Sequence, residues 1–209
     1  MPDRIAGGRG SRRRRRAAAC RRADEPFAVA DPACPPATPS AWRRVGATVD
    51  AHDTIPGPFG QPLQRLGNAQ NAFARLDGPP LASLAPGVRA IFTAVVAAPT
   101  TLSSALVLTS AFGQAELHVD WTEAPPSFVL LDRRAGLAVE TGTVDGLGMD
   151  IWRLALAARN EAHEAVAVKP SLHVASGIGN AGMSVGLYAG LLRTGFAEAA
   201  SGGPDAPTG

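Results

Sequence analysis

The sequence predicts one all-β domain between about residues 38 and 200, and three observations predict it. The chain has 209 residues, which is room for one ordinary domain with a sizeable core. From Ala115 to Trp121 apolar residues alternate with polar ones, and a period of two is typical of a strand with one buried face. Runs rich in β-branched and aromatic residues, bounded by Pro and Gly, lie close to this segment in the sequence. These patterns favour sheets over helices.

Residues 1–37 form an arginine- and proline-rich leader that we expect to be disordered, and residues 201–209 form a Gly- and Pro-rich tail that we expect to fray. Two interpretations of the leader stay open. Clustered guanidinium groups attract polyanions, so the run could anchor the domain to a larger particle through Arg12, Arg13, Arg14, Arg15 and Arg16. The same composition also fits a start of translation assigned too far upstream in a GC-rich gene, with the true start near Val29 or Val45.

Charge and hydrophobicity exclude several classes of function. After residue 22 the chain has 11 basic and 17 acidic residues with only one lysine, whereas binding to phosphate backbones needs clustered Lys or Arg. Nucleic acid is therefore not an expected partner of the domain. No run of about 18 apolar residues exists, so no membrane-spanning helix is expected. Cys20 and Cys34 lack the CxxC spacing, and neither a disulfide framework nor a zinc site is predicted.

The candidate strands follow one another along the middle of the chain. Val88–Ala97 is rich in β-branched and aromatic residues between two proline-containing turns, which suits a buried strand. Leu102–Thr109 is predicted to be the next strand, and Ala115–Trp121 follows it with its clear alternation. Pro125 and Pro126 then interrupt the pattern, and Phe128–Leu131 resumes it. We expect the last two segments to be neighbouring strands.

The segment Asp150–Ala167 is ambiguous. Its Ala, Leu, Arg and Glu residues are good helix formers, and propensity alone predicts a helix. The alternation of Trp152, Leu154 and Leu156 instead suits a strand, and Asn160-Glu161 could form the turn of a hairpin. The residues of this segment leave both alternatives open.

Two glycine motifs near the C-terminus match enzyme signatures without the context those signatures need. Residues 177–182 match G-x-G-x-x-G, but a dinucleotide fold needs a second strand and a distant acid, and only 27 residues remain. We interpret the motif as a loop between strands. Residues 182–186 match the nucleophile elbow G-x-S-x-G, but no histidine follows His173 to complete the order Ser, acid, His. No catalytic residue is predicted.

No metal site and no cofactor are predicted from the histidines. The four histidines show none of the spacings typical of zinc or iron sites. Structural calcium stays open, because its oxygen ligands can come from loops without a readable motif. The candidate ligands would be Asp50, Asp53, Asp145 and Asp150.

Three stretches with aromatic residues resemble motifs of one family. The segment 41–51 (AWRRVGATVDA) is similar to the opening W-x-x-x-G-A-T-V-x-A, and 144–154 (VDGLGMDIWRL) is similar to a strand G-x-G-W-Y-R-V. The segment 180–192 (NAGMSVGLYAGLL) resembles the glycine-rich approach to a final strand, with Tyr188-Ala189-Gly190 where the family has Trp-Gly. In order and spacing they resemble the jelly-roll, carbohydrate-binding-module-like domain of phage tail fibres and of head spikes of phages and gene transfer agents.

The resemblance implies a fold and a function. The fold would be a jelly-roll β-sandwich over residues 38–200, in which residues 151–158 and 164–175 are paired strands. The function would be that of a non-enzymatic module on the surface of a phage-like particle made in the bacterial cytoplasm. Its expected partners are cell-surface or capsular polysaccharide, other virion subunits and further copies of itself.

Aromatic rings are the expected sugar contacts, because flat faces pack on the C–H face of a sugar ring at low entropy cost. The candidate carbohydrate-binding residues are Trp42, Trp121 and Tyr188, with core packing as the competing role, which the apolar strand face favours for Trp121. Trp152 and Arg153 are expected to be motif and core positions.

Two other functions compete with sugar binding. The first is a purely structural capsid decoration or spike-base protein, which would bury a patch well above about 1,000 Å² against other subunits. The second is a glycan hydrolase or lyase, which needs two carboxylates at catalytic separation, and no spacing in the sequence indicates such a pair. A sugar-binding protein should instead present exposed aromatic rings in a groove.

Overall fold

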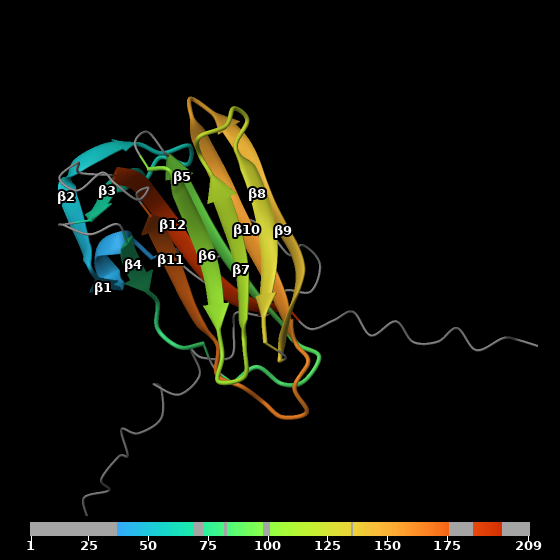
Figure 1. Cartoon of the computed structure of the whole chain (residues 1–209). Helices are drawn as coiled ribbons and strands as arrows, with labels where there is room; N and C mark the ends of the chain where they lie inside the picture. Colours follow the sequence, from blue (N-terminus) through green and yellow to red (C-terminus); the bar gives the residue numbers. More distant parts are fainter. Residues whose placement is uncertain are drawn as a thin grey trace, which may run out of the picture.

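The computed structural model describes residues 37–68, 73–81, 83–97, 101–134, 136–175 and 186–197. Within these ranges the chain forms two antiparallel sheets of six strands each, packed face to face, and a single 3-10 turn (Pro39–Ala41) (Figure 1). The first sheet has the order β1 (Arg43–Val45), β4 (Phe73–Asp77), β11 (Lys169–Ala175), β6 (Ser103–Thr109), β7 (Gln114–Asp120), β8 (Ser127–Arg133). The second has the order β2 (Ala47–Pro56), β3 (Pro62–Asn68), β12 (Gly186–Ala197), β5 (Arg89–Ala97), β10 (Ile151–Asn160), β9 (Leu137–Gly148).

The strand order is that of a jelly roll, which confirms the predicted fold class. Eight strands form its two four-stranded halves, β3-β12-β5-β10 in the second sheet and β4-β11-β6-β7 in the first. The chain crosses between the halves at most connections, and the last strand returns to lie between β3 and β5. Strands β1 and β2 extend one side of the sandwich, and β8 and β9, inserted between β7 and β10, extend the other (Figure 1).

The core lies between the sheets and follows from the alternation of side chains along each strand. In β5 the residues Ala90, Phe92, Ala94 and Val96 are fully buried in the main core cluster. They meet leucines from the opposite sheet, as expected when the inner faces of two sheets interdigitate. Each fully buried large apolar side chain contributes roughly 1.5–3 kcal/mol to the free energy of unfolding.

The strands predicted from periodicity are confirmed. The segments 88–97, 102–109, 115–121 and 128–131 become β5, β6, β7 and β8 with shifts of a few residues at their ends. Strands β7 and β8 are neighbours, and they pair without a bulge from Gln114 opposite Arg133 to Asp120 opposite Ser127.

The predicted pairing of residues 151–158 with 164–175 is wrong, although both segments contain strands. Strand β10 lies between β5 and β9 in the second sheet, and β11 lies between β4 and β6 in the first. The buried Asn160 explains the crossing. Its Nδ2 donates to the carbonyls of Leu84 (2.8 Å) and Glu164 (2.9 Å), which turns the chain toward the other sheet. Helix propensity is overridden because alternating leucines of β10 are buried in the core.

Several predictions concern residues outside those that the structure describes. They are the leader with Arg12–Arg16, the loop at residues 177–182 and the tail at residues 201–209. Among the described residues, no helix is long and apolar enough to cross a membrane.

Candidate functional site

A pocket of about 520 Å³ opens at the end of the sandwich where β7 leads into β8. Ile55 and Ala97, the loop of residues 123–126 and the turn Met149-Asp150 form part of its wall. The remaining lining is aromatic and consists of Trp121, Trp152 and Tyr188. We call it the aromatic pocket. Its volume lies in the range of about 300–1,000 Å³ that is usual for sites of small ligands.

The two tryptophans of the pocket hold each other in place. Trp121 follows the end of β7, and its indole Nε1 donates a hydrogen bond of 3.0 Å to the hydroxyl of Ser104 on β6. The rings of Trp121 and Trp152 meet edge to face, with centroids 6.2 Å apart and planes at 61°. Such edge-to-face pairs are favourable beyond the area they bury. The orientation of Trp121 is therefore fixed before any ligand arrives.

Trp152 lies against a strand position that has no side chain. Gly146 of β9 pairs with Trp152 of β10, and a Cβ atom at Gly146 would be 3.3 Å from Cζ3 of the indole ring. This distance is tighter than ordinary van der Waals contact, so glycine makes room for the ring. The position of Trp152 in the pocket thus depends on the sequence of the neighbouring strand.

Tyr188 of β12 is held by a short chain of polar contacts. Its hydroxyl donates to Oδ1 of Asp53 at 2.8 Å, and Oδ2 of Asp53 forms an ion pair of 3.0 Å with Arg65. The hydrogen bond to Asp53, together with partial desolvation, raises the pKa of Tyr188 above its usual value. The phenol therefore stays neutral at physiological pH. Its hydroxyl hydrogen is donated to Asp53, so the hydroxyl can only accept a hydrogen bond from a ligand.

The turn between β9 and β10 is strained at the rim of the pocket. Met149 (φ 54°) and Asp150 (φ 56°) both adopt left-handed backbone conformations in a two-residue hairpin. Asn and Gly usually occupy such turns, and other residues cost about 1 kcal/mol or more there. Met149 is also 84% exposed. Strain of this kind at the edge of a pocket points to a role in binding.

The structure brings together two of the three predicted carbohydrate-binding residues. Trp121 and Tyr188 line the aromatic pocket, and Trp152, which was expected to be core, lines it while also packing against the core. Trp42 is elsewhere. It is only 6% exposed, and its ring stacks on the ring of Phe92 with centroids 5.4 Å apart. Trp42 therefore presents no free face to a sugar and is a core residue.

Arg153 points to the other face of β10 because side chains alternate along a strand. There its guanidinium forms an ion pair of 2.8 Å with Asp145. Arg153 is therefore a surface position of the outer sheet face, and not a contact of the aromatic pocket.

The four aspartates named as calcium candidates are not gathered into one cluster of ligands among the described residues. Asp50 accepts hydrogen bonds from the backbone N–H groups of His52 and Asp53, which lower the pKa of its carboxyl group. Asp53 binds Tyr188 and Arg65, and Asp145 binds Arg153. In the part of the chain that the structure describes, no three His, Cys, Asp or Glu side chains are grouped to hold a metal ion.

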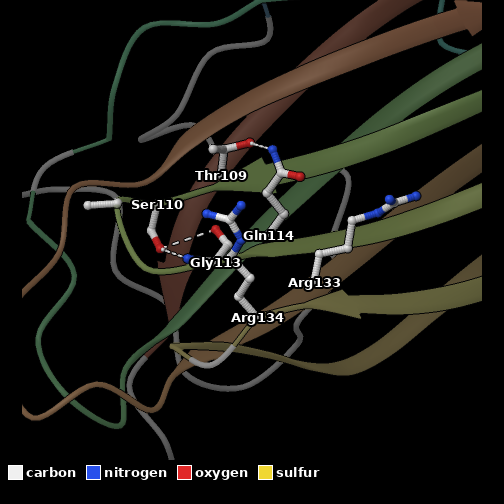
Figure 2. Close-up of a pocket in the computed structure, with 7 residues that line it drawn as sticks. Thr109, Ser110, Gly113, Gln114, Arg133 and Arg134 are labelled. Atoms are coloured by element: carbon white, nitrogen blue, oxygen red, sulfur yellow. Dashed lines mark hydrogen bonds between the residues drawn. The ribbon is translucent and has the colours of Figure 1, made fainter.

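A second pocket, of about 580 Å³, lies at the opposite end of β8 (Figure 2). Arg133 and Arg134 line it together with the β6–β7 turn, and we call it the arginine pocket. Arg133 forms an ion pair of 2.8 Å with Glu116, whereas Arg134 has no hydrogen bond or ion pair with any described residue. Arg134 has φ 75°, and Figure 2 shows its guanidinium reaching toward Gly113 and Gln114.

Sequence reasoning missed both the arginine pocket and the turn Met149-Asp150. The adjacent pair Arg133-Arg134 before Gly136 was visible, but nothing in it indicated a left-handed, unpaired arginine. Comparison with models of known protein families, and with the sequences of curated proteins, finds no match for this chain.

Proposed function

We propose that this protein is a non-enzymatic carbohydrate-binding module and that the aromatic pocket holds sugar rings of a cell-surface or capsular polysaccharide. The observation that carries the proposal is the meeting of Trp121, Trp152 and Tyr188 around one open pocket. These residues come from three separate parts of the chain, and only the jelly-roll topology brings them together.

The chemistry of the pocket suits a sugar. A pyranose ring has apolar C–H faces and a rim of hydroxyl groups, so it needs aromatic surface and hydrogen-bonding groups in the same place. The aromatic rings supply the surface, and the carboxylates of Glu123 and Asp150 at the pocket can accept hydrogen bonds from hydroxyl groups. Because Trp121 and Tyr188 are already held by hydrogen bonds, little side-chain entropy is lost on binding.

The wider setting of the proposal is a phage-like particle, supported by the three ordered motifs that resemble head-spike and tail-fibre domains. Other virion subunits would then be partners, and the arginine run at residues 12–16 would anchor the domain. Deleting residues 1–36 should abolish incorporation into particles while the isolated protein still binds glycan. Unchanged incorporation would refute the anchoring role.

The direct test is a glycan array of bacterial capsular and lipopolysaccharide glycans, followed by calorimetry with the best hit. We expect weak binding, in the micromolar to millimolar range. W121A should reduce affinity at least tenfold because it removes the most fixed ring, whereas Y188F should keep most of it because the ring remains. F112A is the matched control, since Phe112 is 43% exposed but lies outside the pocket. Absence of signal on the array, or equal binding by W121A, would refute the proposal.

One observation keeps the hydrolase alternative testable, because Glu123 and Asp150 both line the pocket. A glycosidase needs one carboxylic acid and one carboxylate on either side of the scissile bond. Incubation of the bound glycan with the protein should release no new reducing ends. Release that disappears in E123Q would instead establish an enzyme.

A further inference from the structure

Strand β8 is an edge strand whose side chains are exposed on both faces. All seven of its residues are exposed, and four consecutive ones are apolar, with Phe128 at 43%, Val129 at 56%, Leu130 at 38% and Leu131 at 36%. On one side β8 pairs with β7, and on the other it is the last strand of its sheet (Figure 1). Alternate backbone N–H and C=O groups along the outer edge therefore have no partner strand.

Native sheets usually protect such an edge, and β8 carries charged residues only at its end, Asp132 and Arg133, leaving residues 128–131 unprotected. Edge strands are commonly kept short, bulged, interrupted by proline or marked by lysine. The seven residues of β8 include neither proline nor lysine, and their pairing with β7 has no bulge. A long, regular and apolar edge is a template for another strand.

The sequence of β8 is compatible with pairing to itself. In an antiparallel pair centred on Leu130, Leu130 lies opposite Leu130 of the second copy and Val129 lies opposite its Leu131. The remaining pairs join Ser127 to Arg133 and Phe128 to Asp132, so no two like charges are directly opposite. Val129, Leu130 and Leu131 of each copy then lie opposite apolar side chains of the other copy, and only Phe128 lies opposite a charged residue, Asp132.

The charges at the two ends of β8 favour the same arrangement. The loop before β8 carries Glu123, which has no partner among the described residues, and the residue after β8 is the unpaired Arg134. Antiparallel pairing brings the beginning of one strand beside the end of the other. Arg134 of each copy would therefore lie opposite Pro126 of the second copy, close to its Glu123. The guanidinium of Arg134 reaches toward Gly113 and Gln114 in the single copy (Figure 2), and in the pair it would turn to the free edge of β8 to meet the opposite charge.

We propose that two copies of this chain associate through antiparallel pairing of their β8 strands, with Glu123 of each copy facing Arg134 of the other. The first sheet of one copy and the first sheet of the other then form one continuous sheet of twelve strands across a two-fold axis. This is the self-complementary symmetry of most soluble dimers.

The first experiment measures the association of the full chain by sedimentation equilibrium. We expect a dimer, and we expect V129K to raise its dissociation constant at least tenfold, because a charge would lie in the strand interface. Val129 is more than half exposed, so the substitution should leave the fold of one copy intact, which circular dichroism checks. F59K is the matched control, because Phe59 is 48% exposed in the β2–β3 turn, away from β8.

A second experiment tests the charge pairs without touching the strand. E123R and R134E should each weaken the dimer several-fold, and the double variant should recover most of the loss because each pair is restored in reverse. Recovery of this kind cannot come from damage to a single copy. Additive losses would refute the proposed facing of these two residues.

A third experiment tests the register. In a background with C20S and C34S, L130C should form a disulfide-linked dimer under mild oxidation, since directly opposite residues have Cα atoms within reach of a disulfide. F59C should form no disulfide-linked dimer under the same conditions. A monomer at all concentrations, or a dimer that is insensitive to V129K and gives no cross-link at L130C, would overturn the proposal.

Discussion

Trp42 and Trp121 show how the same residue type takes opposite roles in this protein. Trp42 precedes the short strand β1 and stacks on Phe92 in the core, whereas Trp121 follows β7 and lines the aromatic pocket. We expect W42A to lower the free energy of unfolding by about 3–5 kcal/mol, because it leaves a large cavity beside Phe92. Its folded fraction should bind glycan like the wild type.

The converse is expected for W121A, which should lose glycan binding at a smaller cost in stability. Urea unfolding and calorimetry on both variants separate the two effects. Loss of binding in W42A under conditions where it is fully folded would show that its role had been misassigned.

His173 on β11 gives a residue-level prediction about pH. Burial, together with the nearby Arg75, lowers the pKa of His173 from about 6.5 to about 4. Below pH 6.5 the unfolded chain takes up a proton at this position and the folded chain does not, so stability falls as the pH drops from 6.5 toward 4. At 1.36 kcal/mol per pKa unit the loss is at most about 3.4 kcal/mol.

The free energy of unfolding, measured with urea between pH 7 and 4.5, should therefore fall less steeply with decreasing pH in H173N than in the wild type. H163N is the control, because His163 is exposed in the crossing between the sheets. Parallel pH profiles for wild type and H173N would contradict the assigned cause.

At the level of elements, we expect the turn Met149-Asp150 to affect both the free energy of unfolding and the affinity of the aromatic pocket for glycan. Replacing the pair by Asn-Gly places residues suited to the left-handed conformation in both positions, and we expect the free energy of unfolding to rise by about 1 kcal/mol. Glycan affinity should fall at the same time, because the exposed methionine at the rim is lost. Thermal unfolding and calorimetry on M149N/D150G provide the measurement, and unchanged affinity would show that the strained turn has no part in binding.

The sequence predicted most single strands because alternation is a local property. It predicted β7 and β8 as neighbours, since a short connection joins them. It could not predict that β10 and β11 lie in different sheets, because the cause is a set of hydrogen bonds from Asn160 to residues distant in the chain. The residues of the aromatic pocket were likewise predictable only in part. Trp121 and Tyr188 were predicted from residue type, but the separation of Trp42 from them depends on three-dimensional packing.

At the level of the whole molecule, the proposed dimer would carry two aromatic pockets. Each pocket lies near the beginning of β8, so antiparallel pairing places the two at opposite ends of the shared strand pair. A long polysaccharide could engage both, and linked sites of this kind gain about 10²-fold or more in apparent affinity.

We therefore expect V129K to bind a short soluble oligosaccharide like the wild type but to bind a surface coated with the polysaccharide much more weakly. Surface plasmon resonance on the coated surface and calorimetry in solution compare the two cases. Equal retention of V129K and wild type on the coated surface would exclude a contribution of the dimer to binding.

The last strand also places its own C-terminal end at the end of the sandwich opposite the aromatic pocket. Tyr188 near the start of β12 pairs with Ala97 at the pocket, whereas Ala197 at its end pairs with Arg89, eight residues or about 26 Å further along β5. A support joined to the chain beyond Ala197 would thus hold the domain by its base. The pocket would then stand at the tip, where a surface glycan reaches it before any other part of the sandwich.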